Sequence, residues 1–535
     1  MMMKHRIFLL FLVLSLMCGL CACTAAPTDT GASAQTDELS DAQETTASSV
    51  SDGTETIIQF TDEAVSVSGS GCEADGTALT VSESGVYRLS GSCADGSVTI
   101  KKGTTDVTLI LDNLTLTSTD TAPITCGKSS QVTIEAAAGT VNALSDSEQN
   151  NGDTYPANEN AENAVFKCKD GSQVTLCGTG SLTLTANGKN GIKSGASTDE
   201  DGEASLTIRE LTLTIHAPVN DAINARQLLT IESGELTISA ADDAIHCDYT
   251  LQIGAEGTDG PAISITDCYE GLEAATLNVA SGDIRIRASD DCLNAANSDL
   301  TGFDFSMNLS GGTINAYTTD GDGFDSNGTM TISGGTICVW TANTADNQPL
   351  DADGTITITG GTVLAAGGSA GMGMKLSVSQ PYVTFGQSGS MQPRGGGADA
   401  LISNGSTLAI WDETDTLFSM EAPCSARFVF YSSPELTEDG SYTLLSDGEN
   451  AGTAEAQTGE SQSGFGGMPG GRPGGFDPNG EVPSDMPNSE TPPTPPDGGT
   501  PPEKPDGTSM PEPPDGSTPP EKPDGAPEPP DSGSV

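Results

Sequence analysis

The feature that most constrains the fold is a short acidic segment that recurs along residues 220–353. Each copy places acidic or amide residues just before an apolar anchor, as in DDAIHC and DDCLNA. The anchors are Ile223, Ile245, Leu272, Leu293, Phe324 and Leu350, and successive anchors are 22, 27, 21, 31 and 26 residues apart. Self-similarity at a period of about 20–50 residues is typical of repeat architectures, so these segments predict stacked units rather than one globular core.

Each repeat also has the pattern of short β-strands. A glycine opens an alternating run before the acidic corner, as at residues 234–239, 282–287 and 335–340, and another short run follows the corner, as at residues 356–358. Apolar and polar residues that alternate, with many β-branched side chains, are typical of half-buried strands. Because the repeat leaves no room for crossover helices, the sequence predicts an all-β parallel β-helix, a solenoid whose coils pair with one another.

The first 23 residues have the pattern of a lipoprotein signal peptide and lipobox. Lys4 and Arg6 precede an apolar run at residues 7–17 that is too short for a comfortable membrane span. The run leads to LCAC, which resembles the bacterial lipobox with Cys23 as the lipidated residue. We therefore expect the chain at the extracellular face of the bacterial cell membrane, held there by its lipid anchor only; the alternative is an ordinary cleaved signal.

Composition divides the remaining chain into three parts. Residues 24–54 are rich in Ser, Thr, Ala and Asp without a hydrophobic period, which predicts a flexible linker. Residues 55–448 keep strand character and form the predicted β-helix domain, with caps because the ends of a solenoid need covering. Residues 449–535 include repeats of PPEKPDG, and we expect this Pro/Gly/Asp-rich tail to be disordered because it cannot bury apolar surface.

The charge balance restricts the partners. The chain has 75 acidic and 20 basic residues, a formal net charge of −55, so nucleic acid is a poor partner and divalent cations are good ones. The ten cysteines after the lipobox show no CxxC spacing, which argues against zinc. We expect free, mostly buried thiols, with Cys247 and Cys338 filling the stack; a Cys72–Cys93 disulfide is the alternative. We expect a monomer.

The repeated acids predict bound calcium. Neighbouring coils are about 4.8 Å apart, and carboxylates stacked at that spacing repel by about 1 kcal/mol per pair even in a water-like dielectric. Calcium would offset this repulsion because it binds six to eight hard oxygens. The alternative is that the acids only form tight turns that face water. The predicted metal ligands are Asp221, Asp242, Asp243, Glu270, Asp290, Asp291, Asp320, Asp322, Asp325, Asp351 and Asp353.

A second set of residues predicts a carbohydrate-binding strip. Aligning the strands on their opening glycines places Arg287, Tyr317 and Trp340 at one outward position, with Arg285 and Asn315 two residues earlier. Aromatic faces stack on sugar rings, while Arg and Asn form hydrogen bonds with hydroxyl groups or pair with carboxylates. The alternative is that Tyr317 and Trp340 cover an exposed edge of the stack.

The segment from about residue 57 to residue 368 resembles the secreted carbohydrate-binding parallel β-helix family, formerly a domain of unknown function. The resemblance rests on residues 85–91 (GVYRLSG), residues 107–116, residues 138–146 (AGTVNALSD) and the repeated acidic corners. It implies a right-handed parallel β-helix similar in architecture to pectate lyases. It also implies calcium sites and the binding of cellulose or acidic, polygalacturonate-like plant polysaccharides at a bacterial surface.

Two other classes remain open. A calcium-dependent polysaccharide lyase on this fold needs a basic residue at the α-proton of a uronate. The candidates are Lys189, Lys193, Arg226, Arg285 and Arg287, but none lies in a recognisable catalytic signature, so no catalytic residue is predicted. The third class is a non-catalytic adhesin or structural surface protein in which the solenoid is a rigid spacer.

Overall fold

The computed structural model describes residues 55–342, 347–368, 374–386 and 400–462. The predicted signal peptide, Cys23, the linker and residues 463–535 of the predicted tail lie outside the described residues. Residues 449–462, which were predicted to belong to the tail, contain two β-strands. The regular structure of the described ranges consists of β-strands without an α-helix, so no helix in them is long and apolar enough to cross a membrane. The all-β class predicted from the alternating pattern is confirmed.

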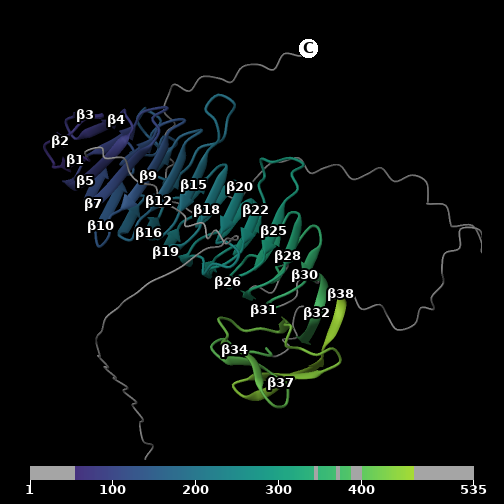
Figure 1. Ribbon diagram of the computed structural model, residues 1–535. Helices are drawn as coiled ribbons and strands as arrows, with labels where there is room; N and C mark the ends of the chain where they lie inside the picture. Colours follow the sequence, from purple (N-terminus) through teal and green to yellow (C-terminus); the bar gives the residue numbers. More distant parts are fainter. Residues whose placement is uncertain (1–54, 343–346, 369–373, 387–399, 463–535) are drawn as a thin grey trace, which may run out of the picture. The chain divides into compact units, whose positions relative to one another are not determined.

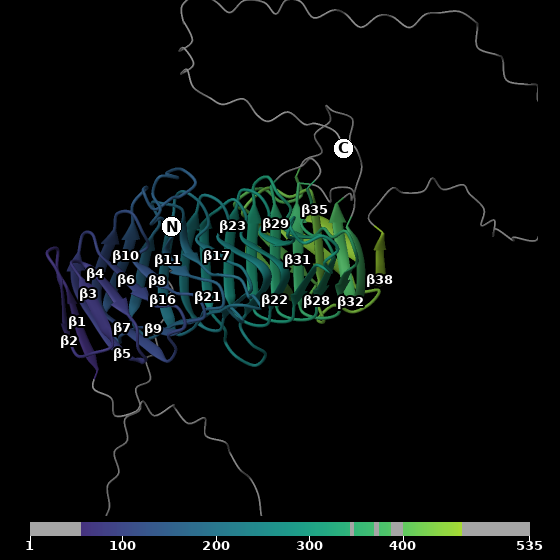
Figure 2. The same ribbon diagram turned by 90° about the horizontal axis from the view of Figure 1, so that it is seen from above.

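The strands wind into successive coils, and equivalent strands pair in parallel along three ladders (Figures 1 and 2). The first ladder follows the acidic corners. It contains β4 (Ala78–Val81), β6 (Ser97–Ile100), β8 (Ile124–Cys126), β11 (Ala164–Cys168), β14 (Asn190–Lys193), β17 (Ile223–Ala225), the first parts of β20 (Ile245–Ile253) and β22 (Leu272–Val279), β24 (Leu293–Ala295) and β27 (Phe324–Ser326).

The second ladder begins with β1 (Thr56–Phe60) and the first parts of β5 (Gly85–Cys93) and β7 (Val107–Ser118). It continues through β9 (Gln131–Ala136), β12 (Gln173–Cys177), β15 (Ser205–Ile208), β18 (Leu228–Ile231), the second parts of β20 and β22, β25 (Ser306–Leu309), β28 (Thr329–Ile332), β30 (Ile356–Ile358) and β32 (Lys375–Gly386).

The third ladder begins with the second parts of β5 and β7. It continues through β10 (Val141–Asp146), β13 (Ser181–Thr185), β16 (Leu211–Ala217), β19 (Gly234–Ala240), β21 (Ala262–Asp267), β23 (Asp283–Ala288), β26 (Thr313–Thr318), β29 (Thr336–Thr341) and β31 (Thr362–Gly367). Three parallel ladders with short connections are the pattern of a parallel β-helix, as the repeats predicted.

The core is a stack of the predicted anchors. Ile223 pairs with Ile245, Ile245 with Leu272, Leu272 with Leu293, Leu293 with Phe324 and Phe324 with Leu350, and all six side chains are fully buried. Each such side chain contributes about 1.5–3 kcal/mol by leaving water. The prediction that equivalent apolar residues of successive coils form one vertical file is therefore confirmed.

The ten cysteines of the described residues are free thiols, and all but Cys72 are buried. The predicted free thiols are thus confirmed, and the alternative Cys72–Cys93 disulfide is wrong. Cys247 and Cys338 fill space among apolar neighbours as expected.

Antiparallel strands border both ends of the coils. Near the start, β2 (Val65–Ser68) pairs with β1, and β3 (Cys72–Asp75) pairs with β4. Near the end, β35 (Phe428–Ser432) pairs with β31 and β32, and β38 (Gln457–Gln462) pairs with β32. A separate antiparallel sheet contains β33 (Thr407–Trp411), β34 (Thr416–Glu421), β36 (Ser441–Ser446) and β37 (Glu449–Glu455).

The predicted exposure of Trp340 is wrong. Its position in β29 does face outward, but the side chain is only 1% exposed. It packs in a second core with Leu364 of β31, Ile410 of β33, Tyr431 of β35 and Ile402, which precedes β33. The outward face of the last coils is therefore covered by the C-terminal segment, and Trp340 is not available to stack on a sugar.

Candidate functional site

Two files of polar side chains run along the first ladder, and we call them together the polar face. Phe166 and Ile192 pair in register ahead of Ile223 and continue the file of anchors. The corner file is the residue two before each anchor from Ile192 onward: Asn190, Asp221, Asp243, Glu270, Asp291, Asp322 and Gln348. The strand file is the residue after each anchor: Lys167, Lys193, Asn224, His246, Glu273, Asn294, Asp325 and Asp351. The strand file faces out because each anchor is drawn into the core, and the next residue on a pleated strand points to the opposite side. The corner file lies where the chain turns into each strand, and Asn190, Asp221 and Gln348 of this file are buried.

Backbone pairing fixes the register of both files. The amides of Ala222 and Ala244 donate to the carbonyls of Asp243 and Glu270 in the next coils, at 3.0 and 2.9 Å. His246 pairs with Asn224 on one side and with Glu273 on the other. Equivalent polar residues of adjacent coils therefore lie one strand spacing apart.

Three carboxylates meet near the end of the polar face. One oxygen atom from each of Asp322, Asp325 and Asp351 lies within 4.8 Å of the others. Asp291 lies beside them, and its Oδ1 accepts a hydrogen bond from the Asp322 amide at 2.6 Å. Within the described ranges no basic side chain forms an ion pair with these four acids. We call these four residues the acid cluster.

The acid cluster has uncompensated negative charge. Burial, with the other carboxylates adding to it, raises the pKa of Asp291 to about 8 and that of Asp322 to about 7, and it raises the pKa of Asp325 as well. Carboxylates with such raised pKa values favour either a proton or a bound cation. The donors are all hard oxygens, which is the ligand set that calcium prefers.

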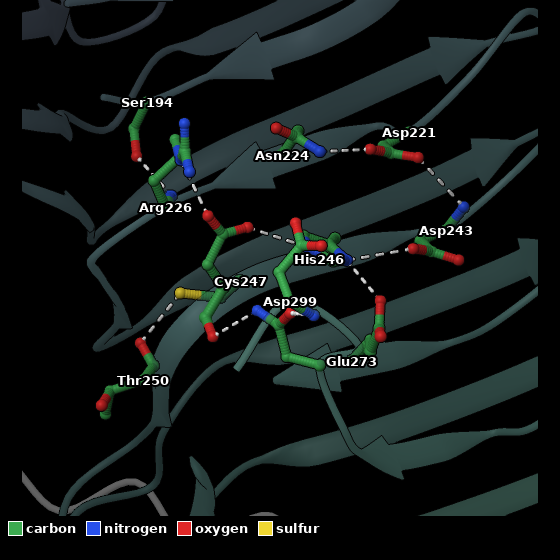
Figure 3. A network of polar contacts seen from close by, with 12 residues as sticks. Ser194, Asp221, Asn224, Arg226, Asp243, His246, Cys247, Thr250, Glu273 and Asp299 are labelled. Carbon is green, nitrogen blue, oxygen red and sulfur yellow. Dashed lines mark hydrogen bonds and ion pairs between the residues drawn. The ribbon is translucent and has the colours of Figure 1, made fainter. Parts of the chain in front are cut away.

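His246 and three acids form a different kind of network (Figure 3). Its Nδ1 contacts Glu273 Oε2 and lies 3.3 Å from Asp243 Oδ2, and its Nε2 lies 3.1 Å from Asp248 Oδ1. Asp248 also accepts a hydrogen bond from Arg226 Nε at 2.7 Å. The acids of this network are thus already paired with cations inside the protein.

The imidazole of His246 is charged at neutral pH. Burial alone would lower its pKa, but the contacts with Asp243, Asp248 and Glu273 outweigh burial and raise it to about 12. A protonated imidazole has no lone pair for a metal. The three side chains Asp243, His246 and Glu273 are close enough to surround an ion, but their own cation makes them a weaker site than the acid cluster.

Asn294 and Glu270 lie between the acid cluster and the network of His246. The Asn294 amide Nδ2 donates to Glu270 Oε2 at 3.1 Å, while its Oδ1 is buried and has no hydrogen-bond partner among the described residues. Burial, followed by the charges of Asp243 and Glu273, raises the pKa of Glu270 to about 8. Asn294 lies between Glu273 and Asp325 in the strand file, so its free oxygen is one further ligand for a cation or a hydroxyl group.

Aromatic side chains border the polar face on both edges. Tyr269 is 47% exposed at the corner that leads into β22. At the opposite corner, Phe303 is 36% exposed, and its ring centroid lies 6.2 Å from that of Tyr249 and 5.5 Å from that of Phe305. The Asn297 amide holds this loop by donating to the Asp248 carbonyl at 2.9 Å. Exposed rings at such edges suit contact with the apolar faces of sugars.

The structure distributes the predicted metal ligands unequally. Asp221, Asp243, Glu270, Asp291 and Asp322 belong to the corner file, and Asp325 and Asp351 to the strand file. The Asp290 side chain instead forms a hydrogen bond with Tyr269. Three predicted ligands are exposed and outside both groups of close-packed donors: Asp242, Asp320 and Asp353. Metal binding by any of the predicted ligands remains a prediction.

The predicted carbohydrate-binding strip lies on the third ladder. Arg285 pairs in register with Asn315, and Arg287 with Tyr317, whose ring centroid lies 5.1 Å from the Arg287 guanidinium. Arg285 also forms an ion pair with Asp283 at 2.7 Å. Tyr317 lines a cavity of about 290 Å³ that Asn404, Pro423 and Arg427, among others, complete. Without Trp340, this strip remains a shorter candidate surface.

Three of the five basic residues considered for lyase chemistry form ion pairs. Lys189 pairs with Asp153, Arg226 with Asp248, and Arg285 with Asp283. Sequence reasoning missed His246, Glu273 and Asn294 of the polar face, and it missed the bordering aromatic residues Tyr249, Tyr269 and Phe303. The members of the strand file could have been identified from the sequence, because each one directly follows an anchor. No sequence pattern identifies the aromatic residues in the loops.

These observations define a parallel β-helix protein with a mostly acidic outer face. The model of the carbohydrate-binding domain-containing protein family matches residues 75–371, more than half of the chain, and the chain belongs to that family. The resemblance seen in residues 85–91, 107–116 and 138–146 is thus confirmed.

Two known proteins are similar to this chain. A carbohydrate-binding domain-containing protein of Acetivibrio thermocellus is 33% identical over 115 residues, which are 21% of this chain and 39% of that relative. The chain therefore aligns with well under half of the relative's length. The solved structure of a polysaccharide lyase-like protein from C. thermocellum, a gadolinium derivative, is 21% identical, covers 61% of this chain and 97% of its own, and has a TM-score of 0.31.

Proposed function

We propose that this protein binds plant-type polysaccharides, cellulose or acidic pectin-like glycans, along the polar face, with calcium at the acid cluster. The observation that carries the proposal is the group of Asp322, Asp325 and Asp351, whose oxygens converge without a basic partner in the described chain. Membership of a carbohydrate-binding family supports the ligand class.

Calcium fits the donors of the acid cluster. Carboxylates and amide oxygens are its usual ligands, and the flexible coordination of calcium tolerates donors from neighbouring coils. Asp291 contacts the Asp322 backbone and Asn294 pairs in register with Asp325, so we expect these two residues to supply further oxygens. A bound divalent cation would offset the burial and the mutual repulsion that raise these pKa values, and its open coordination positions would accept oxygens of a sugar.

The aromatic borders support an extended ligand. Tyr269 on one edge and Phe303 on the other leave the carboxylates and amides between them. A sugar chain offers apolar C–H faces to such rings and hydroxyl groups to the polar files. The Arg287–Tyr317 strip on the third ladder is a second candidate surface for the same function.

We further propose that the chain acts as a monomer at the outside of a bacterial membrane, anchored through Cys23. The support is the positively charged start, the apolar run and LCAC in the sequence. Labelling with a radioactive or clickable fatty acid tests this proposal. The intact chain should be labelled and Cys23→Ala should not; equal labelling of both would contradict it.

Calcium titration followed by thermal melting tests the metal site. We expect saturating calcium to raise the melting temperature by about 4 °C or more, because a ligand that binds only the folded state stabilises it by about 2.7 kcal/mol at one hundred times its Kd. Asp322→Asn combined with Asp325→Asn should abolish this rise while leaving the calcium-free melting temperature unchanged or higher, since repulsion is relieved.

The matched control combines Asp199→Asn with Asp259→Asn, two exposed acids on other loops. The control should keep the full calcium response. A calcium response that survives in the Asp322/Asp325 variant would place the ion elsewhere and contradict the proposed site.

A further inference from the structure

The strand file begins with two lysines, at the end of the polar face opposite the acid cluster. Lys167 of β11 and Lys193 of β14 pair in register, so their side chains are neighbours on adjacent coils. The residues beside them, Phe166, Cys168 and Ile192, are buried, and this alternation directs both lysines to the outside of the first ladder. Both lysines are half-buried.

Neither ammonium group has an anionic partner among the residues that the structure describes, although the cations on either side do. Lys169 pairs with Glu162 at 2.5 Å, and Lys189 pairs with Asp153. Two stacked lysines without a counter-ion are unexpected in a chain with 75 acidic and 20 basic residues. Burial, and next the charge of Lys193, lower the pKa of Lys167 to about 8.

The nearby acids are held in other contacts. Glu162 and Asp153 lie in the loop of residues 147–163, where Asn150 Oδ1 accepts hydrogen bonds from the Glu162 amide at 2.7 Å and the Asn163 amide at 3.2 Å. On the side of the next coil, Lys193 faces Asn224, and the Asn224 amide donates to Asp221 Oδ2 at 2.6 Å. The paired lysines therefore present positive charge that no described side chain neutralises by direct contact.

The position of the lysines indicates which ligand would neutralise them. They lie in the same file as His246, Glu273 and Asp325, so a glycan along the polar face passes over them. A neutral glycan such as cellulose offers only hydroxyl groups. A polyuronate carries one carboxylate on each sugar, and lysine–carboxylate hydrogen bonds between charged groups are about twice as strong as neutral ones.

We propose that Lys167 and Lys193 form a carboxylate-binding subsite that selects polyuronates over neutral glycans. This inference rests on the proposed function, because it takes the ligand to lie along the polar face. It names the substrate class within that function: a chain of uronic acids, with the carboxylates of successive sugars held by the two stacked ammonium groups.

The test is isothermal titration of the full chain, at fixed calcium, with oligogalacturonate and with a cello-oligosaccharide of equal length. The probe variant combines Lys167→Gln with Lys193→Gln. The matched control removes two exposed cations outside both files, Lys101→Gln with Arg209→Gln. We expect the natural chain to prefer oligogalacturonate. The probe variant should lose affinity for it by about tenfold or more, and the control should change it by about twofold or less.

A second variant keeps the outcome independent of folding. Lys167→Arg with Lys193→Arg retains both charges and should keep most of the affinity, and the melting temperature of each variant shows whether it is folded. Equal oligogalacturonate binding by the natural chain and the folded glutamine variant would overturn the subsite and leave the proposed function intact. Binding of neither oligosaccharide by the natural chain would instead overturn the proposed function and the subsite with it.

Discussion

At the scale of single residues, the position beside each buried anchor determines the chemistry of the polar face. The anchor always enters the core, so the residue after it always faces out, and its identity alone changes from coil to coil. The file begins with two lysines, continues with asparagine, histidine, glutamate and a second asparagine, and ends with two aspartates. His246 is the member whose role is internal, because its charge compensates acids of the protein itself.

The role of His246 predicts a large effect of its removal. His246→Gln leaves Asp243, Asp248 and Glu273 half-buried with one cation fewer, and breaking such a partly buried network costs about 3 kcal/mol. Thermal melting at neutral pH should show a clear loss of stability. The control His216→Gln changes an exposed histidine whose Nδ1 lies 3.1 Å from Ser239 Oγ, and it should have little effect. Equal effects of both variants would contradict the network.

The raised pKa values predict that stability falls with rising pH. Glu270 and Asp291, with pKa values of about 8 in the folded chain and near 4 when unfolded, oppose folding fully above about pH 8, and this opposition fades as the pH falls toward about 4. The contribution of His246 has the same direction: it is complete below about pH 6.5 and is lost as the pH rises toward about 12.

Melting of the calcium-free protein between about pH 5.5 and 8.5 measures this dependence. The melting temperature should decrease steadily across the range. Bound calcium should reduce the part of this decrease that the carboxylates cause. Carboxylates whose pKa values are lowered, such as Asp170 and Asp248, lose their stabilising contribution only below about pH 4 and do not interfere. A melting temperature that rises with pH would contradict the burial of these acids.

At the scale of strands, the sequence predicted what depends on neighbouring coils and missed what depends on distant segments. Period-two alternation identified the buried anchors and placed Trp340 on the outward side of its strand, both correctly. It could not show that residues some sixty to ninety positions later, including Ile402 and Tyr431, pack over that side. The acids were likewise predicted as one group. The pairing register between coils decides which acids meet in the acid cluster and which meet His246, and the sequence does not give this register.

Burial of Trp340 predicts a structural rather than a binding phenotype. Trp340→Ala opens a cavity between β29 and the C-terminal strands and should cost about 3–5 kcal/mol. The half-buried Trp411 is the matched control, and Trp411→Ala should lower the melting temperature less. Loss of glycan retention in Trp340→Ala without a lower melting temperature would contradict its burial.

At the scale of the whole molecule, the stacked coils turn a repeated segment into a continuous surface. Contacts in a solenoid are mostly between neighbours, so one repeat pattern was enough to predict the fold. The same repetition places a cationic pair, a neutralised network and an acid cluster along one face of the first ladder. For a chain with a net charge of −55, the proposed binding of an acidic glycan would depend on the two lysines and on calcium at the acid cluster.

The most direct test of this account is the affinity of the full chain for polygalacturonate with calcium and with chelator present. We predict binding in calcium that weakens by about tenfold or more in chelator, and equally in the Asp322→Asn/Asp325→Asn variant, while Asp199→Asn/Asp259→Asn binds like the natural chain. Binding of equal strength with calcium, with chelator and in the Asp322/Asp325 variant would contradict a calcium-assisted polysaccharide site on the polar face.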